Sequence, residues 1–241
     1  MGGVNRTTIK KLLKVNFVYS AFINFRHFGL KGLLKMPIVI GYGSTFKCKS
    51  KGGISFVKKL RPNMLSIKNR NNICIEDGGK LICNGAKACF NISNTVSVSN
   101  KGVLMLGDNF FANTQNVFLV TAAGVLKVGN NFFANGPTEI NCKKALTFGD
   151  DVLLSVHVIF LDTDYHPIFD SSGQRINYDR EIIIGNKVWI GCNATVLKGS
   201  VIGNNIIVGA GAIVSGKLLS DHSIYGGNPI RILKSGVTWC P

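Results

Sequence analysis

The chain has 241 residues and a formal net charge of +16. Residues 1–70 hold fifteen Lys or Arg and no Asp or Glu, whereas the rest of the chain holds 13 basic and 12 acidic residues. Seven cysteines form no C-x-x-C pair and have no histidine at zinc-binding spacing, which argues against a disulfide framework and a zinc finger. We expect small buried cysteines in a reducing compartment.

Residues 1–40 form a basic segment in which aromatic and basic residues are interleaved. Residues 7–35 are expected to form one or two short helices that end near Met36 and Pro37, because proline disfavours helix in the preceding residue. This pattern favours an amphipathic helix on an anionic membrane surface over a nucleic-acid tail. Packing on the rest of the protein is the alternative. The uncharged run 15–25 is too short to cross a bilayer, and no signal-cleavage site follows it.

From about residue 41 the chain consists of short apolar pieces separated by Gly and Asn, and toward its end the pattern has a period of six. The anchors are Ile184, Ile190, Val196, Ile202, Val208 and Val214. This period fits neither an α-helix nor an open strand and is typical of a parallel β-helix of stacked short strands. Glycine follows four anchors, where we expect it to ease the turn of the backbone. The predicted β-helix covers 41–215.

Before the regular repeats, an apolar-Gly-polar-polar corner recurs at 106–109, 128–131 and 148–151. Its spacings of 22 and 20 predict coils lengthened by insertions. The repeat disappears over 162–180, and a long irregular excursion from a solenoid is usually functional. Residues 216–241 are expected to close the last coil, whose core would otherwise be exposed.

His166 is the candidate catalytic residue because it lies in this irregular loop. Asp164 precedes it by two residues, and Pro167 restricts the chain after it. An imidazole titrates near neutrality and is a natural general base for a hydroxyl group. The remaining histidines, His27, His157 and His222, lie in less suggestive positions.

Three motifs resemble a known family: Asp164-Tyr165-His166-Pro167, the segment 184–191, and Gly226-Gly227-Asn228-Pro229-Ile230-Arg231. Over 148–234 the chain resembles the hexapeptide-repeat O-acetyltransferases that act on galactosides and maltose. The whole chain is most similar to bacterial capsular and cell-surface polysaccharide acyltransferases. The resemblance implies a left-handed coil, a homotrimer and a bacterial protein. We expect it in the cytoplasm, and the basic aromatic segment predicts peripheral contact with the inner membrane. It also implies transfer of acetyl from acetyl-CoA to a hydroxyl of a surface saccharide, including lipid-linked forms.

The resemblance assigns roles to individual residues. His166 would take the proton of the sugar hydroxyl as it attacks the thioester, and backbone N–H groups would stabilise the oxyanion without a metal. Substrate contacts fall to Asp164, to Trp189 and to Asn135, the last contributed by a neighbouring subunit. Trp189 is equally explained as an aromatic that fills the trimer seam. The acetyl-CoA contacts carry over to Cys192, Ala210, Ser215, Arg231 and Lys234.

Three positions depart from the family pattern. Cys192 replaces a serine and Lys234 replaces an arginine, which alters a hydroxyl contact and a bidentate phosphate contact. Lys143 stands where the family has a carboxylate, which predicts an acceptor other than a simple galactoside.

Other functions fit the sequence less well. A zinc enzyme of the γ-carbonic-anhydrase type needs three histidines in the coils, where only His157 and His166 are present. A nucleotide-binding motif is incomplete at Gly209-Ala210-Gly211 and lacks a βαβ unit. An amino-sugar N-acetyltransferase, a longer acyl donor and a non-catalytic β-helix scaffold remain alternatives, and nucleic acid is not an expected partner.

Overall fold

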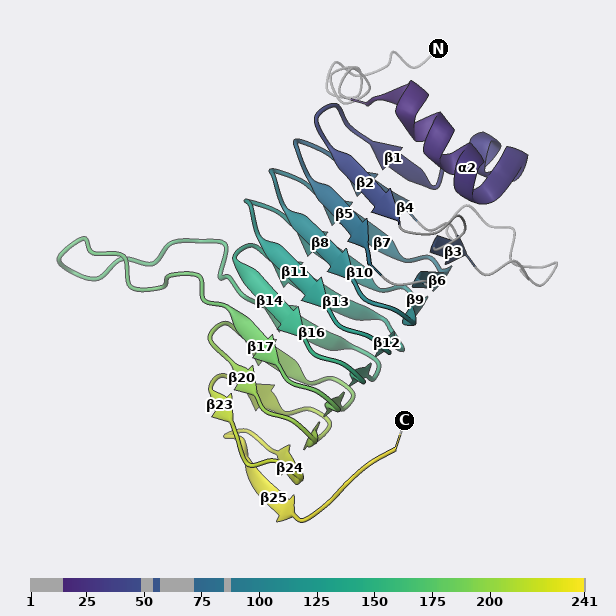
Figure 1. Ribbon diagram of the computed structural model, residues 1–241. Helices are drawn as coiled ribbons and strands as arrows, with labels where there is room; N and C mark the ends of the chain where they lie inside the picture. The colour runs from purple at the N-terminus through teal and green to yellow at the C-terminus, as the bar shows by residue number, and fades with distance from the viewer. Residues whose placement is uncertain (1–14, 49–53, 57–71, 85–87, 241) are drawn as a thin grey trace, which may run out of the picture.

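The structure, a computed structural model, describes residues 15–48, 54–56, 72–84 and 88–240. It is a left-handed parallel β-helix in which each coil contributes one strand to each of three sheets (Figure 1). The fold class predicted from the sequence is therefore confirmed. We number the sheets 1, 2 and 3 in the order in which the chain visits them. The turns between them are called the 1–2, 2–3 and 3–1 corners.

Sheets 1 and 2 each contain eight strands stacked in chain order. The strands of sheet 1 are β1 (Ile38–Ile40), β4 (Asn72–Ile75), β7 (Thr95–Val98), β10 (Val117–Val120), β13 (Thr138–Cys142), β16 (Val158–Leu161), β19 (Thr195–Leu197) and β22 (Ile213–Val214). The strands of sheet 2 are β2 (Thr45–Cys48), β5 (Lys80–Cys83), β8 (Val103–Leu106), β11 (Val125–Val128), β14 (Ala145–Phe148), β17 (Ile182–Ile184), β20 (Val201–Ile202) and β23 (Lys217–Leu218).

Sheet 3 has nine strands because a final antiparallel strand is added at its C-terminal edge. Its strands are β3 (Ile54–Phe56), β6 (Ala88–Ile92), β9 (Phe110–Thr114), β12 (Phe133–Ala134), β15 (Leu153–Leu154), β18 (Trp189–Ile190), β21 (Ile206–Val208), β24 (Ser223–Gly226) and β25 (Arg231–Ser235). β25 folds back on β24 and ends the stack, in the place where a closing element was expected. The first coil begins at Ile38 and the last parallel strand ends at Gly226, so the stack reaches beyond 41–215 at both ends.

The six hexapeptide anchors are all buried, on the consecutive strands β17 to β22. Successive hexapeptides therefore lie in sheets 2, 3 and 1 in rotation, and the pairing of Ile183 with Val201 shows that one coil equals three hexapeptides. We call these the short coils. The coils before them are longer, as the pairing of Val125 with Val103 on one side and with Ala145 on the other shows. The corner spacings of 22 and 20 are thus whole turns of these long coils.

Phenylalanine side chains fill the interior of the long coils. Phe110 stacks on Phe132 with ring centroids 5.4 Å apart, and Phe132 meets Phe148 at 5.1 Å. Phe148 in turn contacts Phe160 at 5.0 Å. The short coils carry Ile, Val and Ala in their interior instead. Side chains of different volume therefore give continuous apolar packing along one solenoid.

Two of the glycines that follow the anchors, Gly185 and Gly191, serve the stacking of coils rather than the turning of the chain. The left-handed backbone at two of these corners falls on Lys187 (φ 55°) and Asn193 (φ 58°), and not on Gly185 or Gly191. A Cβ on Gly185 would lie 2.6 Å from the carbonyl oxygen of Gly203, closer than any real Cβ contact. The expectation that these glycines ease the turn is therefore wrong at Gly185 and Gly191, where the backbone of the next coil leaves no room for a side chain.

A ladder of Asn and Asp side chains joins the coils at the 2–3 corner. The N–H of Asp108 donates to Asn130 Oδ1 at 2.8 Å, and the N–H of Asn130 donates to Asp150 Oδ1 at 2.6 Å. The N–H of Asp150 donates to Asn186 Oδ1 and that of Asn186 to Asn204 Oδ1, both at 2.8 Å. The ladder pairs corner N–H groups and runs from the long coils into the short coils without interruption.

Helix α2 (Phe17–Lys35) covers the N-terminal end of the β-helix (Figure 1). Asn24 donates through Nδ2 to the carbonyl of Ile38 at 2.6 Å and accepts the N–H of Ile38 through Oδ1 at 3.1 Å. Ser20 Oγ accepts the N–H of Ile40 at 2.9 Å. These two side chains give the edge strand β1 the hydrogen bonds that another strand would supply, which protects an otherwise open edge.

The helix expected over 7–35 is present over 17–35, with a break in the helical backbone at Gly29 (φ 65°, ψ −156°), while residues 1–14 lie outside the described part. One face of α2 packs on the β-helix, which is the predicted alternative to a membrane surface. Ser20 and Asn24 stand among aromatic residues in the sequence. Their hydrogen bonds to the edge strand β1 could not be predicted from the sequence and are seen only in the structure. Among the described residues, no helix combines the length and apolar character needed to span a bilayer.

Candidate active site

The irregular segment between β16 and β17 projects from the 1–2 corner as a long loop (Figure 1). Leu146 in β14 pairs with Ile182 in β17, and Ile183 pairs with Val201 in the coil that follows. The loop therefore doubles the length of its coil, compared with a short coil, without disturbing the strand register. The loop is itself partly ordered by backbone hydrogen bonds, including Ile176 N–H to the carbonyl of Ile168 at 2.9 Å.

The first residues of the loop are bound to the coil beneath them. The carboxylate of Asp162 accepts the N–H groups of Lys143 and Lys144, each at 2.8 Å. Burial raises the pKa of Asp162, and the two backbone donors oppose that rise. Asp179, at the far end of the loop, accepts the hydroxyl of Thr163 at 2.6 Å and lies 3.5 Å from Lys143 Nζ. Lys143 therefore serves the base of the loop, where it pairs with Asp179.

Asn177 connects the two sides of the loop next to His166. Its Nδ2 donates to the carbonyl of His166 and to Asp164 Oδ2, both at 2.8 Å. Its Oδ1 accepts the N–H of Ile168 at 2.6 Å. Asn177 is buried although the surrounding loop is exposed, and its three bonds hold the backbone of His166 and Ile168 and the carboxylate of Asp164. It acts as a positioning residue for His166.

Asp164 forms an ion pair with Lys198, which belongs to the 1–2 corner of the next coil. The Lys198 ammonium and then the Asn177 amide hold the pKa of Asp164 below its usual range. The carboxylate predicted to bind substrate is thus already engaged in holding the loop against the β-helix.

His166 is exposed at the outer side of this anchored segment. Its N–H donates to the carbonyl of Asp164 at 2.6 Å, and its carbonyl accepts from Asn177. Tyr165, just before it, has a left-handed backbone (φ 58°) and donates its hydroxyl to Asn141 at 2.9 Å. In the described part of the chain, the imidazole ring itself has no hydrogen-bond partner. A strained, well-anchored backbone that presents a solvent-facing imidazole is suited to proton transfer with a bound hydroxyl.

The other predicted site residues fall into two columns at different corners of the β-helix. Ser215 follows β22 and therefore lies at the 1–2 corner, on the same side as the His166 loop. Asn135, Cys192 and Ala210 follow β12, β18 and β21 and lie at the 3–1 corner. A single chain therefore does not bring Asn135, Cys192 or Ala210 to His166. Asn135 is exposed, and its Oδ1 accepts from Asn113 Nδ2 at 3.0 Å.

Trp189 lies on the outer face of sheet 3, next to the 3–1 corner. Its Nε1 donates to Ser155 Oγ at 2.9 Å. Trp239, near the end of the chain, packs against it with ring centroids 6.1 Å apart and donates its own Nε1 to the carbonyl of Lys187 at 3.0 Å. The C-terminal segment thus returns to the site region. Arg231 and Lys234, the two cationic residues predicted to contact acetyl-CoA, are exposed on β25 at the C-terminal end of the same sheet.

An apolar column runs along the outer face of sheet 3 and includes Trp189. In-register pairing aligns one outward side chain from each coil, and Phe111 and Phe133 stack with ring centroids 4.9 Å apart. The members of the column are Phe111, Phe133, Leu153, Trp189, Ile207 and Ile224. A contiguous apolar stripe of this kind on a solenoid surface is suited to contact with another protein surface.

Sequence reasoning missed two residues that hold the loop, Asn177 and Lys198. Neither lies in a recognisable motif. The position of Asn177 in a long loop is a weak indication of a structural role. The role itself depends on hydrogen bonds across the loop, which the sequence does not show. The two coil histidines also lie apart: His157 is at the 3–1 corner and His166 extends from the 1–2 corner. The described residues contain no cluster of three His, Cys, Asp or Glu side chains placed to hold a metal ion.

Comparison with known proteins bears on the repeat and the fold. The family described as Bacterial transferase hexapeptide (six repeats) matches residues 181–216. A polysialic acid O-acetyltransferase of Escherichia coli O1:K1 / APEC is 35% identical over 95 residues, which are 39% of this chain and 31% of that protein. A putative lipopolysaccharide biosynthesis O-acetyl transferase of Escherichia coli strain K12 is 29% identical over 146 residues, covering 57% of this chain and 74% of that protein.

The crystal structure of the polySia specific acetyltransferase NeuO has the same fold, with a TM-score of 0.61 at 24% identity over 83% of this chain and 85% of that one. The resemblance to hexapeptide-repeat acyltransferases is confirmed by these matches, and the left-handed β-helix fold is shared with the acetyltransferase structure. The match to the polysialic acid enzyme of Escherichia coli spans about a third of that relative's length.

Proposed function

We propose that this protein is an O-acetyltransferase that moves an acetyl group from acetyl-CoA to a hydroxyl of a bacterial cell-surface saccharide. The observation that carries this proposal is the exposed His166 on a loop that Asn177 and the Asp164–Lys198 pair anchor to a hexapeptide β-helix. The similarity to O-acetyltransferases of polysialic acid and of lipopolysaccharide biosynthesis supports the reaction and the acceptor class.

In the proposed reaction the imidazole of His166 takes the proton from a sugar hydroxyl. The hydroxyl oxygen forms a bond to the thioester carbonyl carbon, and the carbon–sulfur bond then breaks. The products are a sugar acetyl ester and CoA, whose sulfur receives the proton. Negative charge collects on the carbonyl oxygen in between, and backbone N–H groups at a repeat corner would stabilise it. Asp164 stays bonded to Lys198 throughout and maintains the position of the base.

We infer that the complete site forms between copies of the chain in a homotrimer. His166 and Ser215 lie at the 1–2 corner, whereas Asn135, Cys192 and Ala210 lie at the 3–1 corner, so two chains side by side can supply both halves. Two apolar surfaces support such an arrangement: the column on sheet 3 and the loop side chains. In the loop, Ile168, Phe169, Ile176 and Tyr178 are each more than half exposed.

Acetyl-CoA would bind along the groove between neighbouring chains. Cys192 and Ala210 would contact it from one chain and Ser215 from the other, with Arg231 and Lys234 available for its phosphates. Trp189, on the sheet beside the 3–1 corner, would then form a wall of this groove or part of the contact between chains. The acceptor would include saccharides carried on lipid at the inner face of the membrane.

The direct test is acetyl transfer with purified protein. We expect free CoA thiol to appear only when acetyl-CoA and a capsular, O-antigen or exopolysaccharide acceptor are both present. Mild alkali should then remove the transferred group, because an ester is labile and an amide is not. An alkali-stable acetyl group would identify an N-acetyltransferase, and no thiol release with any acceptor would favour the scaffold alternative. Mass spectrometry of surface polysaccharide with and without the protein identifies the acceptor sugar.

Subunit mixing tests the shared site. His166→Ala chains and Asn135→Ala chains should each be inactive, and a mixed trimer should regain activity because it can hold one intact site. Exchange of subunits is verified first by differently tagged chains. Absence of recovery after verified exchange would show that the two residues do not act in one intersubunit site.

A further inference from the structure

The outer face of α2 carries an apolar stripe that the β-helix does not cover. Val18, Phe22 and Phe25 lie at i, i+4 and i+7 and are 83%, 54% and 53% exposed. The opposite face of the same helix carries the buried Ser20 and Asn24 that bond to β1. Spacing of this kind places the three apolar side chains on one side of the helix. The two faces of α2 therefore have separate tasks, and the outer one lacks a partner among the described residues.

More exposed apolar side chains follow the break at Gly29. Leu30 and Leu34 are 70% and 85% exposed, and Leu33 is exposed as well. Single exposed apolar residues are common on proteins, but six of them within one 19-residue helix mark an interaction surface.

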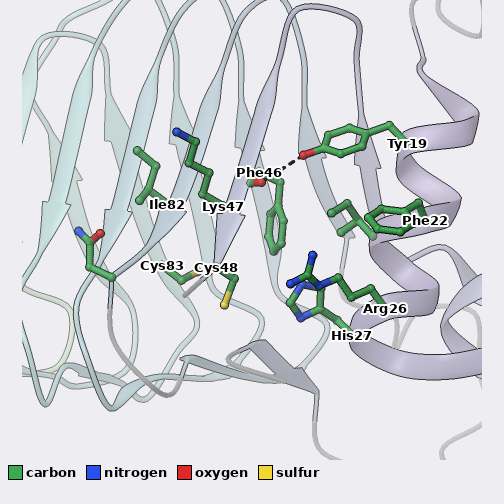
Figure 2. A pocket seen from close by; sticks show the side chains of 11 residues that line it. Tyr19, Phe22, Arg26, His27, Phe46, Lys47, Cys48, Ile82 and Cys83 are labelled. Carbon is green, nitrogen blue, oxygen red and sulfur yellow. Dashed lines mark hydrogen bonds between the residues drawn. The ribbon is translucent and has the colours of Figure 1, made fainter. Parts of the chain in front are cut away.

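A hollow of about 550 Å³ adjoins this helix, between α2 and the strands β2 and β5 (Figure 2). Its walls combine apolar side chains with the exposed cations of Arg26 and Lys47. His27 lines it as well and meets Phe46 edge-on, with ring centroids 5.6 Å apart. Burial, and then the nearby Arg26 charge, lower the pKa of His27, which keeps that wall uncharged near neutral pH. Apolar walls with two cations at the surface suit an amphiphile that has an anionic head.

Charge indicates the partner. The described residues 15–48 include four basic residues, Arg26, Lys31, Lys35 and Lys47, and no acidic one, so two copies of this end would repel each other. An anionic lipid surface attracts the same residues and accepts apolar side chains at the level of its headgroups.

We propose that the N-terminal end of the β-helix docks on an anionic lipid bilayer. The outer face of α2 enters the interface, and Arg26 and Lys47 bind lipid phosphates beside it. This surface lies at the far end of the stack from β25, and it does not depend on the acetyl-transfer proposal (Figure 1).

Vesicle sedimentation of the full chain tests the proposal. Wild-type protein should sediment with vesicles of phosphatidylcholine mixed with phosphatidylglycerol and remain in solution with phosphatidylcholine alone. The variant Phe22→Ser/Phe25→Ser should bind the mixed vesicles at least about tenfold more weakly, because two aromatic side chains no longer leave water. The matched control Ile213→Ser/Leu219→Ser removes exposed apolar side chains far from α2 and should bind like wild type. Circular dichroism establishes that both variants are folded.

A second pair of measurements addresses charge. Arg26→Gln/Lys47→Gln should weaken binding to the mixed vesicles, and added salt should weaken binding of the wild type in the same direction. Equal binding to both vesicle types, binding unchanged by Phe22→Ser/Phe25→Ser, or no binding by the wild type would each overturn the proposal. A concentration-dependent oligomer that this variant abolishes would assign the face to a second copy instead.

Vesicle docking and acetyl transfer can fail separately. The Phe22→Ser/Phe25→Ser variant should acetylate a soluble oligosaccharide at the wild-type rate. The His166→Ala variant should bind mixed vesicles like the wild type.

Discussion

The long coils before the loop and the short coils after it build the same three sheets from different sequences. Between Asn72 and Leu161 each turn is longer than three hexapeptides and encloses phenylalanine, whereas between Ile182 and Val214 each turn is three hexapeptides and encloses Ile, Val and Ala. Strand register and the Asn/Asp ladder at the 2–3 corner are common to both regions. The hexapeptide period is therefore one way to fill this fold, and longer corners with larger interior side chains are another.

The loop lies at the border between the two regions, and this position explains how so long an insertion is tolerated. A solenoid coil contacts only its neighbours, so added residues at one corner leave the strands above and below in register. Asp162 binds the loop to the coil beneath it, and Lys198 binds it to the coil above. The loop that carries the proposed base His166 thus lies where the two regions meet.

The largest expected effect in this comparison is the loss of activity in His166→Ala. Acetyl transfer should fall roughly a hundredfold or more, because proton transfer from the acceptor hydroxyl loses its base. Affinity for acetyl-CoA and the unfolding free energy should change little, since the imidazole has no described hydrogen bond. Steady-state kinetics with calorimetric binding of CoA provides the measurement. His222→Asn is the control at an exposed corner outside the loop, and full activity of His166→Ala would remove the mechanism.

The two kinds of core should differ in their sensitivity to truncation. Phe132→Ala removes a ring that touches Phe110 and Phe148 and should lower the unfolding free energy by about 3–5 kcal/mol. Ile190→Val in a short coil removes one methyl group and should cost only about 0.5–1.5 kcal/mol. Urea denaturation followed by circular dichroism compares them. Equal losses would mean that the phenylalanine interior is not closely packed.

Corner glycines should be equally sensitive in both regions. Gly129→Ala would place a Cβ 2.3 Å from the carbonyl oxygen of Gly149, and Gly185→Ala would place one 2.6 Å from that of Gly203. Each should lower the unfolding free energy by roughly 1–3 kcal/mol through overpacking. Gly216→Ala is the matched control, because its Cβ would meet no atom within 4 Å. A neutral Gly185→Ala would show that the coils can separate slightly at this corner.

The smallest expected effect concerns pH at the first coil. His27 has a pKa below its ordinary value of 6.5, so the unfolded segment binds a proton more readily than the folded one. Stability of the α2 cap should therefore be complete above about pH 6.5 and decrease as the solution is acidified below it. Hydrogen exchange of α2 amides at several pH values measures this. His27→Phe should flatten the dependence, and an unchanged dependence in that variant would assign it to other groups.

The sequence by itself determined the β-helix, the period of its strands and the position of the loop that carries His166. Each strand with its corner places one large apolar side chain in the core every six residues. A six-residue repeat therefore identifies one strand per hexapeptide without knowledge of distant contacts. The helix of the N-terminal segment was recognisable for a similar local reason, because its end is marked by Pro37.

Only the tertiary structure decided which residues meet. Asn135 and His166 lie at different corners of the β-helix. The corner at which a residue lies depends on the number of strands that precede it, and this number cannot be counted in the sequence where the coils have unequal lengths. The bonds of Asn24 to β1, of Asn177 across the loop and the packing of Trp239 on Trp189 join residues distant in sequence. Such contacts follow from the path of the backbone in space, and a linear pattern of residue types carries no record of that path.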